Sequence, residues 1–285
     1  MQIGPYQIQT IEAGVFALDG GAMFGIVPRP LWEKKITPDA RHRIEMRTRC
    51  LLVRGAVAGR QKVILIDTGM GTKWDAKGID IYRVETAQFD LLRGLQDTGV
   101  APEQVTDVIL THLHFDHAGG ATRRAANGGI VPTFPRATYY VQQSHLDWSG
   151  RPTEKDRGSF MPPDFEPLLA AKQLVALDGP TELFPGIALR LSQGHTTGLQ
   201  HPLISDGQTT LFYCADLIPT SLHVPVPWVM AYDIRPLVTI AEKQTILAEA
   251  VANGWILVFE HCPLIGTGTI IKTEKGYALG NAVAC

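Results

Sequence analysis

The sequence predicts one domain of mixed α and β structure. Hydrophobic residues make up 45% of the 285 residues and charged residues 19%, a composition typical of a chain that folds around a core. Short, nearly continuous apolar runs are typical of strands buried on both faces, and helical patterns lie between them. Neither an internal repeat nor a Ser/Gly-rich linker divides the sequence, so we expect a single domain over residues 1–285.

The predicted elements follow one another along the chain. The apolar runs predict strands over 50–53, 63–66, 108–110, 211–213 and 256–259. A helix is predicted over 85–97, where Phe89, Leu92 and Leu95 have helical spacing and Gly99 can close the helix. A second helix begins at Pro236 and ends before Gly254. Its expected buried residues are Leu237, Ile240, Ala241, Leu247, Ala248 and Val251.

Charge and cysteine content exclude several classes of protein. Lys and Arg number 26 against 28 Asp and Glu, so we expect neither a nucleic-acid nor a membrane partner. No segment has the roughly 18 consecutive apolar residues of a membrane span. The amino-terminal stretch does not resemble a secretory signal. The four cysteines, Cys50, Cys214, Cys262 and Cys285, lack CxxC spacing. We therefore expect a cytoplasmic protein with reduced thiols, in which Cys214 and Cys262 are small buried residues.

Metal-type side chains follow four of the predicted strands. Asp67 and His112 come after the second and third strands, and Asp216 and His261 come after the fourth and fifth. Open α/β sheets place their sites at the carboxyl ends of strands. Asp and His are costly to bury without partners, so we expect these side chains to meet at one site.

The segment from His112 to His117 reads HLHFDH and is the strongest signal in the chain. In an extended stretch His112, His114 and Asp116 share one side, and a bend after Asp116 would turn His117. Such a geometry suits two adjacent metal ions.

Further candidate ligands occur downstream. His195 stands in a Gly-His-Thr-Thr-Gly turn, and Asp216 and His261 follow strands. Imidazole with carboxylate suits zinc, with iron, manganese or cobalt as alternatives. Two divalent ions partly neutralised by Asp116, Asp216 and a bridging hydroxide would keep a surplus positive charge, which fits a polarised carbonyl or phosphoryl substrate.

Together these motifs resemble the metallo-β-lactamase superfamily over about residues 50–263. The resemblance implies an α+β fold, a four-layer αββα sandwich with the site at the edge between its sheets. It implies that His112, His114 and His195 hold one metal, that Asp116, His117 and His261 hold the other, and that Asp216 bridges both. Asp67, in its Asp-Thr-Gly turn, would orient a ligand from outside the coordination sphere.

Asp116 and His117 together resemble the dinuclear hydrolase branches. The stretches 21–25 and 227–233 resemble the lactonase and methyl-parathion-hydrolase-like group. The expected reaction is cleavage of a lactone or carboxylic ester, for example an acyl-homoserine lactone, by a metal-bridging hydroxide, with Asp116 or Asp216 as proton shuttle. Many acyl-homoserine lactonases carry a tyrosine where this chain has Pro219. His223 could replace that phenol as a catalytic donor, or it could only hold a loop.

Residues 1–48 are expected to be an amino-terminal extension that packs on the domain near the pocket. Met23, Phe24, Leu31 and Trp32 look too apolar for an exposed loop, so they could wall an acyl-chain pocket, form core or contact a partner in a homodimer. His42, His145 and His201 fit no ligand pattern and are predicted to lie at the surface or in loops.

Other functions remain open from the sequence. Phosphotriester hydrolysis is the first alternative and needs a roomier pocket. A glyoxalase-II-like thioesterase is the second, although no basic patch for glutathione is evident. An oxygen-binding or redox di-iron protein would use the same ligands but generally comes with a flavin domain. A nuclease would usually carry a further domain.

Overall fold

The computed structural model describes residues 1–85 and 90–285, and within them the strands form two seven-stranded sheets. The first sheet has the order β1-β2-β3-β4-β5-β8-β9. Its strands are β1 (Gln2–Ile3), β2 (Tyr6–Asp19), β3 (Arg43–Val57), β4 (Arg60–Ile66), β5 (Asp107–Ile109), β8 (Thr138–Gln142) and β9 (Leu174–Leu177). The second sheet runs from β10 to β16 in sequence order. Its strands are β10 (Thr181–Phe184), β11 (Ile187–Ser192), β12 (Leu199–Ser205), β13 (Thr210–Tyr213), β14 (Ile256–Val258), β15 (Thr267–Thr273) and β16 (Gly276–Ala282).

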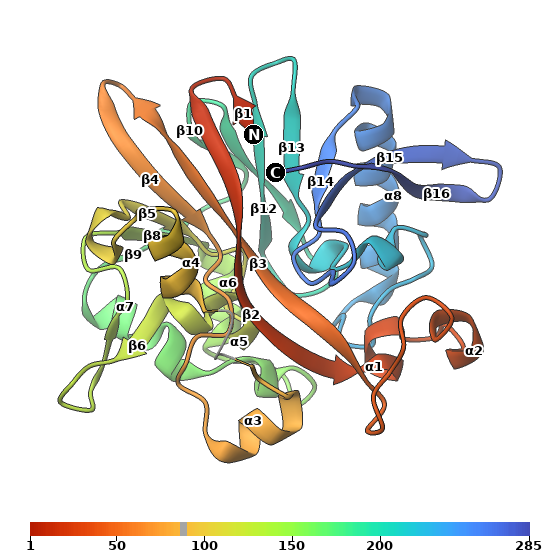
Figure 1. The fold of residues 1–285 in the computed structure, drawn as a ribbon, viewed down its shortest axis with the longest axis horizontal. Helices are drawn as coiled ribbons and strands as arrows, with labels where there is room; N and C mark the ends of the chain where they lie inside the picture. The colour runs from red at the N-terminus through yellow and green to blue at the C-terminus, as the bar shows by residue number, and fades with distance from the viewer. Residues whose placement is uncertain (86–89) are drawn as a thin grey trace.

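Helices cover the outer faces of both sheets (Figure 1). Helix α4 packs against β2 of the first sheet, and α8 packs against β15 of the second. The helices are α1 (Gly20–Phe24), α2 (Arg29–Trp32), α3 (Ala76–Tyr82), α4 (Leu91–Asp97), α5 (Phe115–Ala118), α6 (Gln143–Ser149), α7 (Glu166–Ala170) and α8 (Pro236–Asn253). A small hairpin joins β6 (Thr122–Arg124) to β7 (Ile130–Pro132).

Alternation along β4 explains the four layers. Ile64 and Ile66 enter the core between the sheets, whereas Leu65 enters the core beneath the outer helices of the first sheet. In β13, Leu211 and Tyr213 face the first sheet and Phe212 faces α8. Because each of these strands is buried on both faces, the sequence shows continuous apolar runs. The predicted four-layer αββα sandwich is confirmed.

All five predicted strands are present, in β3, β4, β5, β13 and β14, but β5 ends at Ile109 and β14 at Val258, each one residue before the predicted end. The helix predicted over 85–97 begins at Leu91, with Asp90 as its N-cap, and Gly99 has the expected positive φ of 76°. Glu85 instead forms an isolated bridge with Val15, and Phe89 lies outside the described residues.

The second predicted helix has the expected bounds, but its predicted buried face is partly wrong. Leu247 is buried, whereas Leu237 is 79% exposed and Ala241 and Ala248 lie on the surface. Buried positions instead include Lys243, which has a polar partner set of its own. The apolar pattern did not predict the whole buried face, because this face includes a lysine, which is not a hydrophobic residue.

The amino-terminal 48 residues are part of the sandwich. Strand β2 pairs with β3 from Gln7 opposite Arg54 to Asp19 opposite Arg43, so residues 7–19 belong to the first sheet. Helices α1 and α2, with their loops, connect β2 to β3.

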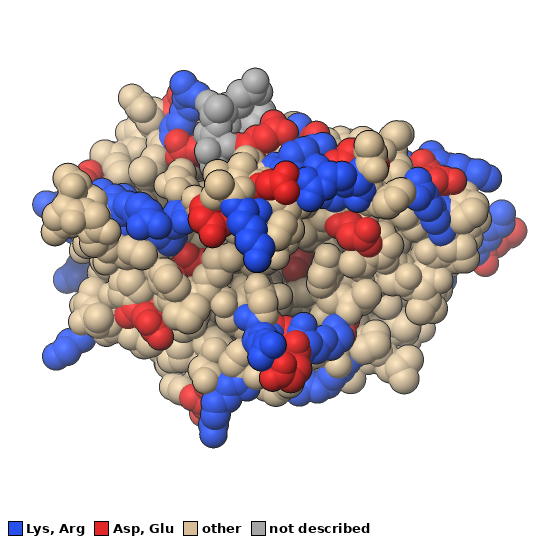
Figure 2. Space-filling model, turned by 90° about the horizontal axis from the view of Figure 1, so that it is seen from below, with Lys and Arg blue, Asp and Glu red and all other residues tan. Residues whose placement is uncertain are grey.

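Within the described residues, no helix is both long and apolar enough to cross a membrane. On the face that Figure 2 shows, Lys and Arg are interspersed with Asp and Glu. This mixture agrees with the formal net charge of −2.

Candidate metal centre

Two parallel strand pairs bring the candidate ligands together. Strand β4 is parallel to β5 in the first sheet, and β13 is parallel to β14 in the second. Parallel strands end at the same edge, so the residues after them share that edge. Asp67 and His112 therefore lie at the edge of one sheet, and Asp216 and His261 at the edge of the other.

The HLHFDH segment turns earlier than predicted. Helix α5 begins at Phe115, directly after His114, which has extended backbone angles. Asp116 and His117 therefore lie in the first turn of a helix, and the chain bends before Asp116 rather than after it. The helical turn directs the side chains of Asp116 and His117 toward the same cluster.

The structure brings all seven predicted ligands into two buried clusters that share Asp216. In each cluster the ligand atoms lie within 4.8 Å of one another. One cluster contains His112, His114, His195 and Asp216, and the other contains Asp116, His117, Asp216 and His261.

Several imidazole nitrogens converge on one another in these clusters. His112 Nε2 and His195 Nε2 lie 3.0 and 3.1 Å from His114 Nδ1, and His117 Nε2 lies 3.1 Å from His261 Nε2. His114 Nε2 and Asp216 Oδ1 are buried without a hydrogen-bond partner among the described residues. Converging lone pairs and an unsatisfied carboxylate oxygen are costly unless a cation lies between them, so the donor set fits two divalent ions.

The opposite nitrogen of most of these rings is held by the protein. His112 Nδ1 donates to Thr111 Oγ1 at 3.0 Å, His195 Nδ1 to Asp233 Oδ1 at 2.9 Å, and His261 Nδ1 to the Arg47 carbonyl at 2.7 Å. Such hydrogen bonds fix the tautomer and leave each Nε2 lone pair for a metal. Sequence reasoning missed Asp233, although it lies in the 227–233 stretch.

Asp67 orients this site from beside it. One carboxylate oxygen accepts from the Thr111 amide at 2.7 Å, and the other accepts from Thr111 Oγ1 at 2.7 Å and from His117 Nδ1 at 3.0 Å. Asp67 is fully buried and has a positive φ of 57°. Its placement agrees with the predicted role of orienting a ligand.

A second carboxyl group, Glu260, reaches the same ring. Its Oε2 lies 3.0 Å from His117 Nδ1, and its side chain is fully buried. Burial, together with the negative charge of Asp67, raises the pKa of Glu260 to about 7. Sequence reasoning missed Glu260, whose only signal is its place between strand β14 and His261.

The histidines of the clusters differ in the direction in which their pKa is shifted. Burial lowers the pKa of His112 and of His114. Burial also acts on His195 and His261, but the Asp216 carboxylate outweighs it and raises the pKa of each to about 9. Asp216 is therefore the main source of negative charge shared by the two clusters.

His145 is not at the surface as predicted but completely buried. Its Nε2 accepts from the Leu113 amide at 2.8 Å, and its Nδ1 donates to the Thr197 carbonyl at 2.7 Å. The ring thus joins the loop of His112 and His114 to the loop of His195. His201 is also buried, against Ser192, so only His42 has its predicted exposure.

The His223 ring is held by other protein groups on both of its nitrogens. Its Nε2 donates to the Met23 carbonyl at 2.8 Å, its Nδ1 is 2.7 Å from Thr220 Oγ1, and its ring stacks on Phe24 at 4.9 Å. It does not line the metal cavity. Because both nitrogens have protein partners, the structure favours the loop-holding alternative. His223 is therefore not free to replace the phenol that is absent at Pro219.

A cavity of about 220 Å³ opens onto the clusters. Met23 lines it, as predicted, together with Leu18, Phe115 and Met230. The predicted wall residues Phe24 and Trp32 instead pack in the core behind it, stacked on each other at 5.3 Å, and Leu31 is 52% exposed. In five-residue α1 only Met23 points to the cavity.

Lys243 fixes the segment that precedes Met230 and Tyr232 of the cavity wall. Its ammonium group donates to the carbonyls of His223, Pro225, Val226 and Trp228 at 2.6 to 3.3 Å. The segment then leads to Met230, which lines the cavity, and to Asp233, which holds His195.

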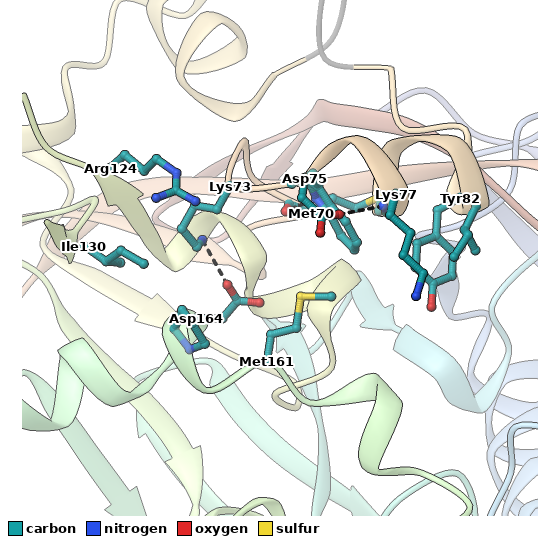
Figure 3. Close-up of a pocket in the computed structure, with 13 residues that line it drawn as sticks. Met70, Lys73, Asp75, Lys77, Tyr82, Arg124, Ile130, Met161 and Asp164 are labelled. Carbon is teal, nitrogen blue, oxygen red and sulfur yellow. Dashed lines mark hydrogen bonds and ion pairs between the residues drawn. The ribbon is translucent and has the colours of Figure 1, made fainter. Parts of the chain in front are cut away.

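A second cavity of about 410 Å³ lies beside the first and shares Tyr82 with it. Figure 3 shows Lys73 and Asp164 meeting across it, with Tyr82 at the end away from Arg124. Lys73 Nζ lies 3.0 Å from Asp164 Oδ1 and also donates to the carbonyl of Thr122. This paired lysine ties the loop after β4 to the segment before α7.

Comparison with known proteins agrees with this geometry. The model of the metallo-beta-lactamase superfamily matches residues 45–267, and the chain belongs to that family. Its α+β sandwich is the fold of that family.

Solved structures cover the whole chain. A probable metal-dependent hydrolase from Staphylococcus aureus is 26% identical with a TM-score of 0.88, and covers 100% of this chain and 99% of its own. A dizinc quorum-quenching lactonase in complex with a product is 24% identical with a TM-score of 0.79, over 100% of this chain and 97% of its own.

Curated relatives match a smaller part. An N-acyl homoserine lactonase from a Bacillus species is 28% identical over 153 residues, which are 50% of this chain and 53% of the relative. The chain thus spans about half the length of the curated relatives it matches.

Proposed function

We propose that this protein is a metal-dependent hydrolase that cleaves lactones or carboxylic esters, with N-acyl homoserine lactones as the leading substrates. The observation that carries the proposal is the pair of four-residue clusters that share Asp216 and line a cavity together with the apolar side chains of Leu18, Met23 and Met230. Relatives named as N-acyl homoserine lactonases support the substrate class.

The residues divide the task by position. His112, His114 and His195 would hold one divalent ion, Asp116, His117 and His261 the other, and Asp216 would bridge them. When bound, two such ions supply Lewis acidity and activated water. Zinc fits the donor set, with iron, manganese or cobalt as the other candidates.

Asp116 is the proposed proton carrier for the leaving oxygen. Its side chain lines the cavity and is 10% exposed, so it can meet both substrate and solvent. Ring opening of a lactone by water leaves an alkoxide that needs one proton, and the Asp116 carboxylate could accept that proton from the attacking water and pass it to the alkoxide. Leu18, Met23 and Met230 would exclude water around an acyl chain.

The test is a substrate panel on protein loaded separately with zinc, manganese, cobalt or iron. We expect hydrolysis of N-acyl homoserine lactones above that of a phosphotriester or a glutathione thioester. His112→Ala should fold, bind less than its full metal complement and lose hydrolysis by at least about a hundredfold. A wild-type protein that binds two ions but hydrolyses only the phosphotriester or the thioester would contradict the proposal.

The homodimer and the cytoplasmic location stay predictions. Size-exclusion chromatography with light scattering measures the first directly.

A further inference from the structure

The metal cavity is lined by polar side chains outside the two clusters. Lys155, Ser159, Tyr82 and Tyr232 reach it. Lys155 is exposed and its Nζ already donates to the Ala231 carbonyl at 2.6 Å. Tyr82 and Tyr232 are partly buried, and neither hydroxyl has a hydrogen-bond partner among residues 1–85 and 90–285. Two phenols beside a substrate cavity are thus free to donate to a ligand.

Both rings are held in place by their surroundings. Tyr82 ends α3 and packs on Phe115 with ring centroids 5.0 Å apart and on Trp74 at 5.5 Å. The Tyr232 side chain packs against the apolar cluster that contains Met23 and Met230, and both of its chain neighbours are anchored. The Ala231 amide donates to the Ala22 carbonyl at 2.8 Å, and Asp233 accepts from His195. Fixed rings lose little freedom when their hydroxyls bind a ligand.

Both tyrosines line the same cavity, and both phenols are protonated there. Burial raises the pKa of both tyrosines, and the negative charge of Asp116 raises each further. The pKa of Tyr232 also responds to the charge of Tyr82. Near neutral pH both phenols are therefore protonated and can donate hydrogen bonds within this cavity.

We propose that Tyr82 and Tyr232 form a phenol pair that donates hydrogen bonds to a substrate carbonyl oxygen outside the scissile ester, such as the amide oxygen of an N-acyl lactone. The inference rests on the proposed function and narrows its substrate class. The scissile carbonyl must meet the clusters, whereas neither phenol is hydrogen-bonded to a cluster residue. The pair therefore serves another polar part of the substrate and favours lactones that carry an acylamino group over alkyl lactones.

The experiment compares two lactones on zinc-loaded protein, N-hexanoyl-L-homoserine lactone and γ-decalactone, which lacks the amide. The proteins are the wild type, Tyr82→Phe, Tyr232→Phe and the control Tyr277→Phe, whose ring lies on the β15–β16 hairpin. Zinc content and circular dichroism verify each variant. Calorimetry with N-hexanoyl-L-homoserine measures binding independently of turnover.

We expect Tyr82→Phe and Tyr232→Phe each to lose about three- to tenfold in kcat/KM on the acylamino lactone and to bind its product more weakly by a similar factor. Their kcat/KM on γ-decalactone should stay within about twofold of the wild type, and Tyr277→Phe should match the wild type on both.

Equal losses on both lactones, or no loss on either, would overturn the phenol pair while leaving the hydrolase assignment intact. A wild-type protein that holds two zinc ions yet opens neither lactone and binds no product would overturn the proposed function, and the phenol pair with it.

Discussion

Single hydrogen bonds set the orientation and the tautomer of the imidazole rings in the two clusters. Asp233 is 2% exposed and accepts from His195 Nδ1 at 2.9 Å, which leaves His195 Nε2 directed at the cluster. Outer partners of this kind typically contribute 10- to 100-fold to metal affinity.

We therefore predict that Asp233→Ala weakens zinc binding by about 10- to 100-fold, because the imidazole loses its orienting acceptor. Competition with a chromophoric chelator measures the affinity. Asp178→Ala is the matched control, since Asp178 is exposed. Indistinguishable zinc affinities for the two variants would refute the role given to Asp233.

The ligands could be predicted from the sequence because they occur in short motifs directly after apolar strands. His112, His114, Asp116 and His117 fall within six consecutive residues. The orienting groups could not be predicted in the same way. His145 reaches Leu113 from 32 positions away, and Asp233 reaches His195 from 38, so only folding brings them together. No local pattern encodes such pairs.

At the scale of elements, glycines allow two loops to touch beneath the site. A Cβ at Gly120 would lie 2.1 Å from the Thr68 carbonyl oxygen, and one at Gly119 would lie 2.2 Å from that of Met70. This close approach keeps the turn of Asp67 against His117, whose carbonyl accepts from the Thr68 amide at 2.8 Å.

Gly120→Ala should lower the free energy of unfolding by about 1–3 kcal/mol, because the backbone must move apart to admit the methyl group. It should also weaken zinc binding, since the displaced turn carries Asp67. Denaturant unfolding and chelator competition measure the two effects. In Gly150→Ala, where the nearest atom would be 3.7 Å away, both should remain near wild type. Unchanged stability in Gly120→Ala would contradict this packing.

The elements themselves show where sequence patterns succeed. Strand β4 was predictable because both of its faces are apolar, whereas the inward face of α8 was not. Lys243 is buried at its centre, and its four carbonyl partners lie between His223 and Trp228, outside the helix.

At the scale of the whole molecule, buried neutral histidines make stability depend on acidity. Burial lowers the pKa of His201 to about 4 and that of His223 to about 3, from an ordinary value of 6.5. The unfolded chain therefore binds more protons than the folded chain below about pH 6.5, and stability falls as the pH falls toward 4.

We predict that the metal-free protein loses stability between about pH 6.5 and 4, with His201 contributing at most about 3 kcal/mol. Urea unfolding in the presence of a chelator, at pH values across that window, measures the dependence. His201→Gln should flatten the curve, and His42→Gln, at an exposed site, should not. A wild-type curve no steeper than that of His201→Gln would show that His201 is already protonated in the folded state.

The carboxylate of Asp216 comes from one half of the sandwich, and the imidazoles of His112, His114 and His117 come from the other. Cations bound there would link the two sheets at the edge where their ligands meet. Every increment of affinity for the ions would then also resist separation of the sheets. Loss of the ions would consequently make the two sheets easier to separate and lower the free energy of unfolding.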